Sequence, residues 1–455
     1  MSKRVFVVSL GCPKNLVDTE VMLGILGRSG YQTCATPEEA QVILVNTCGF
    51  IQSAVEEAID EILRLCSIKE ERPEVRLVVT GCLVQRYGAE LQHELPEVDI
   101  FLGTENIADI ASSLQDLPSP GSSFLAELSA PRFLMHSSLP RQVSTPLHRA
   151  YLKITEGCSN ACSYCMIPSI RGRLRSREVK DIIMEAQRLE SLGVKELTLV
   201  GQDLTAYGLD LGREGPRLPQ LLSHLLAETS IPWLRTLYLY PQRISDLLLE
   251  MMSGNERLLP YLDIPLQHVS PKILRAMNRP SQGGEIEKLF ARIARIIPEA
   301  AVRTTFIVGF PGECEDDVLM LEEFLRNYRL NHVGIFTYSS EEGSMAATLP
   351  DQCPEELKEE RRQRLMELQA GISALKNQQL VGTVQRVLVE GVSTETELLL
   401  EGRLRSQAPE VDGCVYINDG VCAIGDIVSL RITEAHVYDV VGEIVDVGKE
   451  GVSSD

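Results

Sequence analysis

The sequence predicts an α/β protein with three consecutive domains: a parallel sheet at the N-terminus, six βα units in the centre and a small β-barrel at the C-terminus. Strand-like apolar runs alternate with helical patterns as far as about residue 340, which is typical of parallel sheets. After about residue 376 the pattern changes to short apolar runs separated by turns. A chain of 455 residues, 44% of them hydrophobic, can form about three cores.

The N-terminal domain, residues 3–117, is expected to be a Rossmann-like parallel sheet. Its strand-like runs are Arg4–Leu10, Gln41–Asn46 and Val75–Thr80. Cys12, Cys48 and Cys82 follow these runs, each beside a glycine. The carboxyl ends of parallel strands form one edge of a sheet, where ligands bind, so the three thiols should converge. A single cysteine of this kind is often only a buried apolar residue, but three in equivalent places favour a metal-cluster site.

Residues 118–143 are rich in proline and serine and are expected to form a linker, with or without a short hairpin. Residues 144–375 follow as the central domain. Its strand-like runs are Arg149–Thr155, Glu196–Val200, Arg235–Tyr240, Tyr261–Pro265, Val302–Val308 and Val333–Tyr338. Helical patterns separate these runs, and the six units are too few for an eight-stranded barrel.

The loop after the first central strand carries Cys158, Cys162 and Cys165. Such a tight loop can place three thiolates around one face of an iron–sulfur cube, for which thiolates are the usual ligands. A [4Fe–4S] cube takes four ligands, so one iron would stay open, as a catalytic metal site requires. Two other interpretations are buried or disulfide-bonded cysteines and a zinc site, although zinc usually needs a second CxxC pair, which the sequence lacks.

The CxxxCxxC spacing resembles the signature of the radical SAM superfamily, and Tyr164 before the last cysteine also fits. The resemblance implies an open (βα)6 barrel, a [4Fe–4S] cluster on these cysteines, and S-adenosylmethionine (SAM) at the open iron. It also implies SAM contacts at the carboxyl ends of the strands. Gln202 and Asp203 are the best candidates there beside Tyr164, although each could lie in a loop that binds nothing.

Other polar residues near this loop have two interpretations each. Four arginines stand at alternate positions: Arg171, Arg173, Arg175 and Arg177. They either face an anionic group of SAM or of the substrate, or they form a solvated strand edge. His268 is either a proton shuttle or a structural histidine. Arg303 begins a strand, so it either has a role similar to that of the four arginines or, as we expect, lies at the end of the barrel away from the site.

The N-terminal domain resembles that of the methylthiotransferases, because Ser9–Asn15 and Asn46–Phe50 look like motifs of this family. The resemblance implies that Cys12, Cys48 and Cys82 hold an auxiliary [4Fe–4S] cluster, which makes two clusters in all. It also implies that a 5′-deoxyadenosyl radical removes a hydrogen from an unactivated carbon, that the auxiliary cluster presents sulfur, and that a second SAM supplies the methyl group. An external electron donor such as flavodoxin or ferredoxin is needed.

The C-terminal domain, residues 376–446, is expected to be a small OB-like β-barrel. Its expected strands are Gln385–Val389, Glu397–Leu400, Cys414–Ile417, Ile427–Arg431 and Val437–Val441. Position and length resemble a TRAM domain, which often binds RNA in relatives. The segment has five Lys or Arg against twelve Asp or Glu, a difference of −7. Since a nucleic-acid binder should carry a basic patch, nucleic-acid binding is not favoured here.

Ser9–Asn15 and Ser406–Gly413 also resemble the RimO branch of the methylthiotransferases, which modifies an aspartate of a basic protein of the small ribosomal subunit. The expected product is 3-methylthioaspartate, and methylthiolation of a transfer-RNA adenosine is the alternative. A net charge of −20 agrees with a basic protein partner. We expect a cytoplasmic enzyme, because no apolar run approaches the roughly 20 residues of a membrane span and twelve cysteines there favour metal binding over disulfides.

Overall fold

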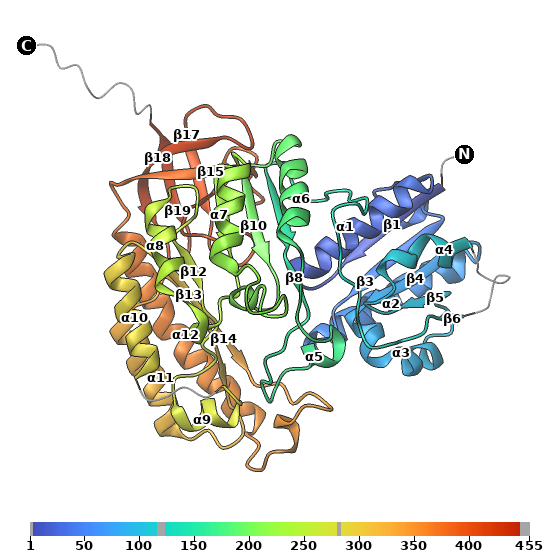
Figure 1. Ribbon diagram of the computed structural model, residues 1–455, viewed down its shortest axis with the longest axis horizontal. Helices are drawn as coiled ribbons and strands as arrows, with labels where there is room; N and C mark the ends of the chain where they lie inside the picture. Colours follow the sequence, from blue (N-terminus) through green and yellow to red (C-terminus); the bar gives the residue numbers. More distant parts are fainter. Residues whose placement is uncertain (1–2, 116–122, 280–283, 446–455) are drawn as a thin grey trace, which may run out of the picture.

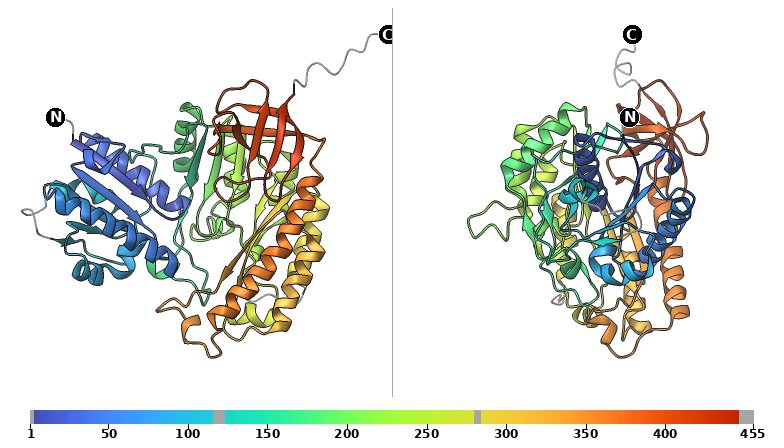
Figure 2. Two further views of the ribbon diagram at one scale, coloured as in Figure 1. Left: turned by 180° about the vertical axis from the view of Figure 1, so that it is seen from behind. Right: turned by 90° about the vertical axis from the view of Figure 1, so that its right-hand side faces the viewer.

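The computed structural model describes residues 3–115, 123–279 and 284–445. The N-terminal sheet and its helices lie on one side of the central strands, and the C-terminal barrel packs against one end of the central domain (Figure 1). The views from behind and from the side show the same arrangement (Figure 2). The predicted α/β class with a small C-terminal β-barrel is therefore confirmed. Among the described residues, no helix combines the length and apolarity that crossing a membrane requires.

The N-terminal sheet has six parallel strands in the order β2-β1-β3-β4-β5-β6. These strands are β1 (Lys3–Ser9), β2 (Tyr31–Thr33), β3 (Val42–Thr47), β4 (Arg76–Gly81), β5 (Ile100–Leu102) and β6 (Phe124–Leu125). Its helices are α1 (Pro13–Arg28), α2 (Gln52–Glu71), α3 (Cys82–Glu94) and α4 (Ile110–Gln115). The sequence predicted β1, β3 and β4 but not the other three strands, because runs of two or three residues show no periodicity.

The segment expected to be a linker begins inside this sheet. Strand β6 pairs with β5, so the sheet continues past residue 117, while residues 118–122 lie outside the described residues. From residue 126 to residue 148 the chain has no helix or strand and forms no hairpin. The prolines of this segment explain the irregular path, because proline cannot donate to a strand ladder.

The central domain contains two parallel sheets of three strands each. Their strands are β7 (Arg149–Lys153), β10 (Glu196–Val200) and β11 (Trp233–Thr236) in one, and β12 (Tyr261–Asp263), β13 (Ala301–Val308) and β14 (His332–Thr337) in the other. An isolated bridge between Leu234 and Leu258 joins the two sheets. The six strands thus form an open arc, as the sequence predicted, although β11 ends four residues earlier than expected because Tyr238 adopts a left-handed backbone (φ 60°).

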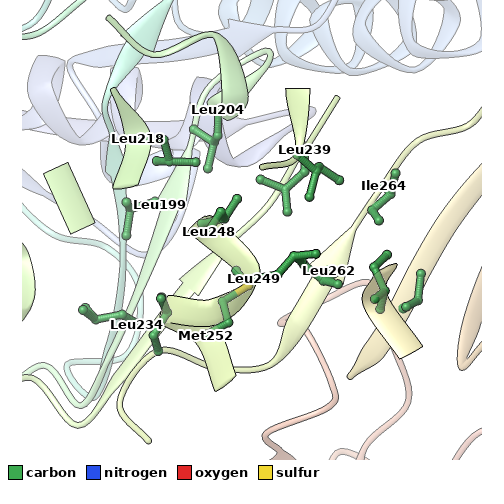
Figure 3. Close-up of a cluster of buried hydrophobic side chains, with 14 of the residues drawn as sticks. Leu199, Leu204, Leu218, Leu234, Leu239, Leu248, Leu249, Met252, Leu262 and Ile264 are labelled. Carbon is green, nitrogen blue, oxygen red and sulfur yellow. The ribbon is translucent and has the colours of Figure 1, made fainter. Parts of the chain in front are cut away.

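Helices cover the outside of the arc. They are α6 (Val179–Ser191), α7 (Leu218–Glu228), α8 (Asp246–Gly254), α10 (Glu285–Ile296), α11 (Glu315–Tyr328) and α12 (Glu355–Gln378), with the short α5 (Ile167–Ile170) and α9 (Pro271–Ala276) near the cysteine loop. Leucines from the strands and helices interlock between them, among them Leu199, Leu234, Leu248 and Leu262 (Figure 3). Each of these four is at most 2% exposed. This core fixes the strands whose carboxyl ends carry the site.

The C-terminal domain is a closed barrel in the order β15-β16-β17-β19-β18. Its strands are β15 (Val384–Val392), β16 (Leu400–Leu404), β17 (Val415–Asp419), β18 (Ile427–Ala435) and β19 (Val440–Ile444). The second strand was predicted too early, at 397–400. Leu398 is 91% exposed before the strand begins, and the pairing with β15 starts only at Leu400, opposite Val392.

The C-terminal barrel covers the amino ends of the central strands. Each of the six strands has a polar contact with it. The contacting pairs are Arg149 with Glu410, Glu196 with Arg403, Arg235 with the Arg405 carbonyl, Tyr261 with Asp412, Arg303 with Asp412, and His332 with the Ser406 carbonyl. The opposite ends of the strands, where the cysteine loop lies, remain accessible to the N-terminal domain.

Candidate active site

Three cysteines meet at the carboxyl edge of the N-terminal sheet. Strands β1, β3 and β4 are direct neighbours, and the residues that follow their carboxyl ends include Cys12, Cys48 and Cys82. Cys12 precedes the first turn of α1, and Cys82 is the first residue of α3. The convergence expected from the parallel sheet is thus present in the structure.

Gly11 and Asn15 allow the segments that carry Cys12 and Cys48 to lie close together. A Cβ atom added to Gly11 (φ 90°) would lie 2.8 Å from the Cβ of Cys48, so a side chain at this position would push the two loops apart. The amide nitrogen of Asn15 donates to the carbonyls of Leu10 (3.2 Å) and Thr47 (2.8 Å). One buried side chain therefore ties the loop of Cys12 to the loop of Cys48.

The second group of cysteines lies in the loop after β7 and the short strand β8 (Thr155–Glu156). The backbone N–H of Asn160 approaches the Cys158 sulfur at 3.4 Å. The Asn160 side chain donates to Asp203 (2.8 Å), and the Asn278 side chain donates to the Ala161 carbonyl (2.6 Å). Residues distant in the sequence thus fix the shape of the loop.

Both groups of cysteines line one cavity of about 310 Å³ between the N-terminal and central domains. All twelve cysteines of the chain are free thiols. No three Cys, His, Asp or Glu side chains in the described part of the chain are spaced for a single metal ion. The thiolates of a cubane cluster bind separate iron atoms, so a cluster does not require such close spacing. Two sets of three convergent, unpaired thiols therefore fit two clusters.

Burial and nearby cations affect these thiols in opposite ways. Burial raises the pKa of Cys82 and of Cys165 to about 12. Burial also acts on Cys12, but the positive charges of Lys14 and Arg171 outweigh it and lower the pKa of this thiol. An iron centre would supply further positive charge and favour all six thiolates.

A buried ion cluster joins the two domains directly beside the cavity. Lys153 pairs with Asp18 and with Glu156 (2.7 Å), while Arg171 pairs with the same two carboxylates at 2.7 and 3.2 Å. Arg171 also donates to Asn15 and approaches the Cys82 sulfur at 3.4 Å. Two cations and two anions therefore fix the distance between α1 and the first central strand.

A groove of about 710 Å³ adjoins the cavity. It runs between the start of α2 and the end of β14, and it shares four lining residues with the cavity: Phe50, Tyr164, Gln267 and Thr305. Phe336 on β14 lines the groove and is 52% exposed. The backbone N–H of Gln52 at the start of α2 donates to Glu341 (2.9 Å), which also pairs with Arg86 of α3 (2.8 Å). The cavity can therefore receive a segment of a large molecule from the side.

Three family models match consecutive parts of the chain. Residues 4–103 match the model described as Uncharacterized protein family UPF0004, residues 152–325 match the radical SAM superfamily, and residues 381–445 match the TRAM domain. These ranges contain the three strand ends of the first domain, the cysteine loop with most of the central arc, and the C-terminal barrel.

Curated relatives resemble the chain over nearly its whole length. Ribosomal protein uS12 methylthiotransferase RimO of Desulfotalea psychrophila is 52% identical over 441 residues, which are 97% of this chain and 99% of the relative. The protein of the same name from Geobacter sulfurreducens is 47% identical over 443 residues, with 97% and 99% covered. The chain belongs to the RimO family. Members of this radical SAM family use a [4Fe–4S] cluster and SAM.

Solved structures share the fold of the RimO-family chain at low sequence identity. The radical S-adenosylmethionine methyltransferase TsrM from Kitasatospora setae, with tryptophan and a SAM analogue bound, has a TM-score of 0.51 and 13% identity, and the match covers 74% of this chain and 73% of that one. The cobalamin-dependent radical enzyme OxsB has a TM-score of 0.51 and 12% identity over 80% and 56% of the chains. At this identity the likeness shows the fold alone.

The three expected SAM contacts of this RimO-family chain all line the cavity. Tyr164 packs edge-on against Phe310, with ring centroids 6.5 Å apart. Asp203 is 4% exposed, and its carboxylate accepts hydrogen bonds from Asn160, Thr205 and Arg243. Asp203 thus supports the cysteine loop, while Gln202 faces the cavity without such bonds among the described residues.

The arginines after the loop are neither a solvated edge nor a single anion-binding row. Arg171 is buried in the interdomain ion cluster, and Arg177 is buried beside Asp181 and Glu185. Arg173 is exposed, and Arg175 donates to backbone carbonyls of the same segment. Alternate residues point to different surroundings because the segment curves around Gly172 (φ 74°).

His268 and Arg303 have definite positions. His268 is fully buried, and its Nδ1 accepts the backbone N–H groups of Val269 and Ser270, both at 2.9 Å. It does not line the cavity, which agrees with the structural interpretation. Arg303 lies near the amino end of β13, as expected, but its side chain lines the cavity and pairs with Asp263 (3.3 Å). The expectation that it lies away from the site is wrong, because its side chain points into the arc.

Sequence reasoning missed several other cavity residues, notably Lys14, Tyr238 and Arg279. The position of Lys14 two residues after Cys12 could have indicated it. No local pattern marks Arg279, which approaches the Cys162 sulfur at 3.8 Å and stacks on Tyr240. Tyr238 was expected inside the strand Arg235–Tyr240, but the strand in the structure, β11, ends at Thr236.

Proposed function

We propose that this chain is a radical SAM methylthiotransferase that adds sulfur and a methyl group to the β-carbon of an aspartate in ribosomal protein uS12, giving 3-methylthioaspartate. The observation that carries the proposal is the shared cavity, which all six convergent cysteines line. The relatives of the same length are named for this substrate and this transfer.

The two groups of cysteines would hold one [4Fe–4S] cluster each. Cys158, Cys162 and Cys165 would bind the cluster that binds SAM, and Cys12, Cys48 and Cys82 would bind the auxiliary cluster. When bound, these cofactors supply the radical chemistry, the sulfur and the methyl group. Tyr164, Gln202 and Asp203 are the proposed SAM contacts. We also propose that an external donor such as flavodoxin or ferredoxin supplies the electron that the reaction needs.

The residues of the chain position these groups. Asn160 and Asp203 fix the SAM-side loop, Asn15 fixes the auxiliary side, and the ion cluster around Arg171 fixes the separation of the two. Phe50, Leu239 and Pro265 add apolar surface to a cavity wall that otherwise consists mainly of polar side chains and thiols.

The proposed partner is a basic protein and not a nucleic acid. The whole chain carries a net charge of −20. In the groove, Glu341 is paired with Arg86 and Glu355 with Lys358, and Glu56 adds a further negative charge to the lining. A positively charged loop is attracted to such a surface, whereas a phosphate backbone is repelled. The proposed location is the cytoplasm, because the proposed substrate is a ribosomal protein.

The proposed domains are those drawn from the sequence, with the first extended to Leu125 because β6 belongs to its sheet. The other two domains keep their predicted bounds: residues 144–375 form the radical SAM core and residues 376–446 the TRAM domain. The connecting segment lies between the first domain and the radical SAM core.

A paired reaction tests the function. The reconstituted and reduced protein receives SAM and either uS12 or unmodified transfer RNA, and mass spectrometry measures the gain of one methylthio group. A gain on an aspartate of uS12 is expected, and a Cys158→Ala variant serves as the inactive control. A gain only on the RNA would overturn the assigned substrate while leaving the type of chemistry intact.

A further inference from the structure

Lys14 is a buried cation at the wall of the cavity. It is the second residue of α1, its side chain is 6% exposed, and it lines the cavity two residues after Cys12. Its Nζ lies 3.7 Å from the centroid of the Tyr238 ring. No ion pair connects Lys14 with a carboxylate among the residues that the structure describes. A buried ammonium is costly unless an anion lies near it. Within the chain the Cys12 thiolate is such an anion, and the cavity leaves space beside the lysine for a second one that comes with the substrate.

The other cations of the cavity wall differ from Lys14. Arg171 has two carboxylate partners, and Arg303 pairs with Asp263 and Asp412. Arg279 has no carboxylate partner among the described residues, but it donates to the Pro265 carbonyl (2.6 Å) and lies beside Cys162 of the other cysteine group. Lys14 is therefore the cation available on the auxiliary side of the cavity.

The aromatic residue that contacts Lys14, Tyr238, has a strained backbone conformation. Tyr238 has a left-handed backbone (φ 60°), which is costly for an aromatic residue and recurs at functional sites. The buried carboxylate of Asp263 accepts the Tyr238 backbone N–H at 3.0 Å and stabilises this conformation. The central domain thus holds an aromatic ring against a lysine of the N-terminal domain, at the place where the two cysteine groups face each other.

We propose that Lys14 binds the side-chain carboxylate of the substrate aspartate and thereby selects aspartate as the target residue. This inference rests on the proposed function. The β-carbon is bonded directly to the carboxyl carbon, so a carboxylate held at Lys14 brings the reacting carbon to the side of the cavity that Cys12, Cys48 and Cys82 line. The ammonium would form a charge-assisted hydrogen bond in a site shielded from water, where such bonds are strong.

A different role for Lys14 would be to offset the negative charge of the Cys12 thiolate. In that case the lysine would not change the relative affinity of the protein for an aspartate and for an asparagine at the target position. The two roles differ in binding selectivity, which can be measured without turnover.

The test compares two labelled peptides that contain the target region of uS12, one with the aspartate and one with asparagine in its place. Their dissociation constants are measured by fluorescence anisotropy with the reconstituted protein. The wild type is expected to bind the aspartate peptide about 10- to 100-fold more tightly. Lys14→Met, which keeps most of the apolar stem, is expected to bind both peptides equally. Lys180→Met, at an exposed position of α6, is the matched control.

Iron content and the absorption spectrum establish that each variant is loaded. If Lys14→Met fails to take up iron, Lys14→Gln and Lys14→Arg replace it, and the preference for aspartate must be lost in the first and kept in the second. A preference that persists without the lysine, or a wild type that does not distinguish the peptides, overturns the proposal. Methylthiolation of whole uS12 by the wild type is measured in parallel, so a wrong role for Lys14 is distinguishable from a wrong substrate.

Discussion

Asp412 of the C-terminal barrel lies 3.4 Å from the guanidinium of Arg303 on β13, so a residue of the last domain contacts a side chain that lines the cavity. The Asp412 side chain is 1% exposed and also accepts hydrogen bonds from the Tyr261 hydroxyl (2.6 Å) and from the Ala408 N–H (2.8 Å). The C-terminal domain therefore contributes to the electrostatics of the site without touching the cysteines.

Replacing Asp412 by alanine is expected to destabilise the junction between these domains. Arg303 would keep only Asp263 as an anionic partner, and the Tyr261 hydroxyl would lose its acceptor. Breaking a buried pair by removing one partner costs about 3–5 kcal/mol. Calorimetry should show the corresponding transition at a lower temperature, while Glu434→Ala on the exposed side of the same barrel should leave it unchanged. Equal transitions in the two variants would contradict the importance of this contact.

Arg171→Met should weaken the attachment of the N-terminal domain and lower its iron content. Asp18 and Glu156 would then share Lys153 alone, and Cys82 would lose a neighbouring positive charge. The expected loss is about 3–5 kcal/mol, measured by chemical denaturation. Arg173→Met is the matched control, because this arginine lies two residues away and is exposed. An equal effect of both substitutions would argue against a specific ion cluster.

Cys82→Ala is expected to abolish methylthiolation and to reduce the iron content from about eight to about four atoms per chain, since each [4Fe–4S] cluster contains four irons. Cleavage of SAM under reducing conditions should continue, because the other cysteine group is intact. Iron analysis and mass spectrometry measure the two effects, and Cys34→Ala, which changes a thiol that does not line the cavity, should retain both clusters. Full activity of Cys82→Ala would refute the auxiliary-cluster assignment.

The contribution of Glu390 to stability should depend on pH. Burial alone would raise the pKa of this carboxyl group, but the contact with His148 and the positive charge of Arg403 (2.8 Å) outweigh it and lower the pKa to about 2. In the unfolded chain the pKa of glutamate is about 4.3. The carboxylate therefore contributes about 3 kcal/mol above pH 4.3, and this contribution is lost as the pH falls toward 2.

Denaturation of the wild type and of Glu390→Gln at several pH values measures this effect. The difference in the free energy of unfolding between them should be constant from pH 7 to about pH 5 and should shrink at lower pH. A constant difference down to pH 3 would show that the charge of Glu390 is unimportant.

The sequence predicted the fold because the strands of the central domain and the helices between them have strong local periodicity. It also predicted the convergence of Cys12, Cys48 and Cys82, because neighbouring parallel strands place their carboxyl ends together whatever the rest of the chain does. The cysteine loop carries its spacing within eight residues, from Cys158 to Cys165.

The meeting of the two cysteine groups could not be predicted in this way. It depends on Asp18, Lys153, Glu156 and Arg171, whose pairing joins residues 135 and 153 positions apart and leaves no local pattern. Lys14 and Arg279 belong to the cavity for the same reason. The short strand β6 was missed because a strand of two residues depends entirely on its neighbour β5 for its hydrogen bonds.

The contacts between the C-terminal barrel and the amino ends of all six central strands also bear on the curvature of the arc. Among the described residues, the two three-stranded halves are joined by the isolated bridge between Leu234 and Leu258 and by a hydrogen bond from the Leu239 N–H to the Asp263 carbonyl (2.8 Å), and not by a regular strand ladder. The C-terminal barrel contacts strands of both halves and therefore helps to fix how the two halves are placed relative to each other. Truncating the chain after α12 would remove the partners that Glu196, Arg235 and Arg303 have in the C-terminal domain, and with them the polar contacts that the two halves of the arc share with one body.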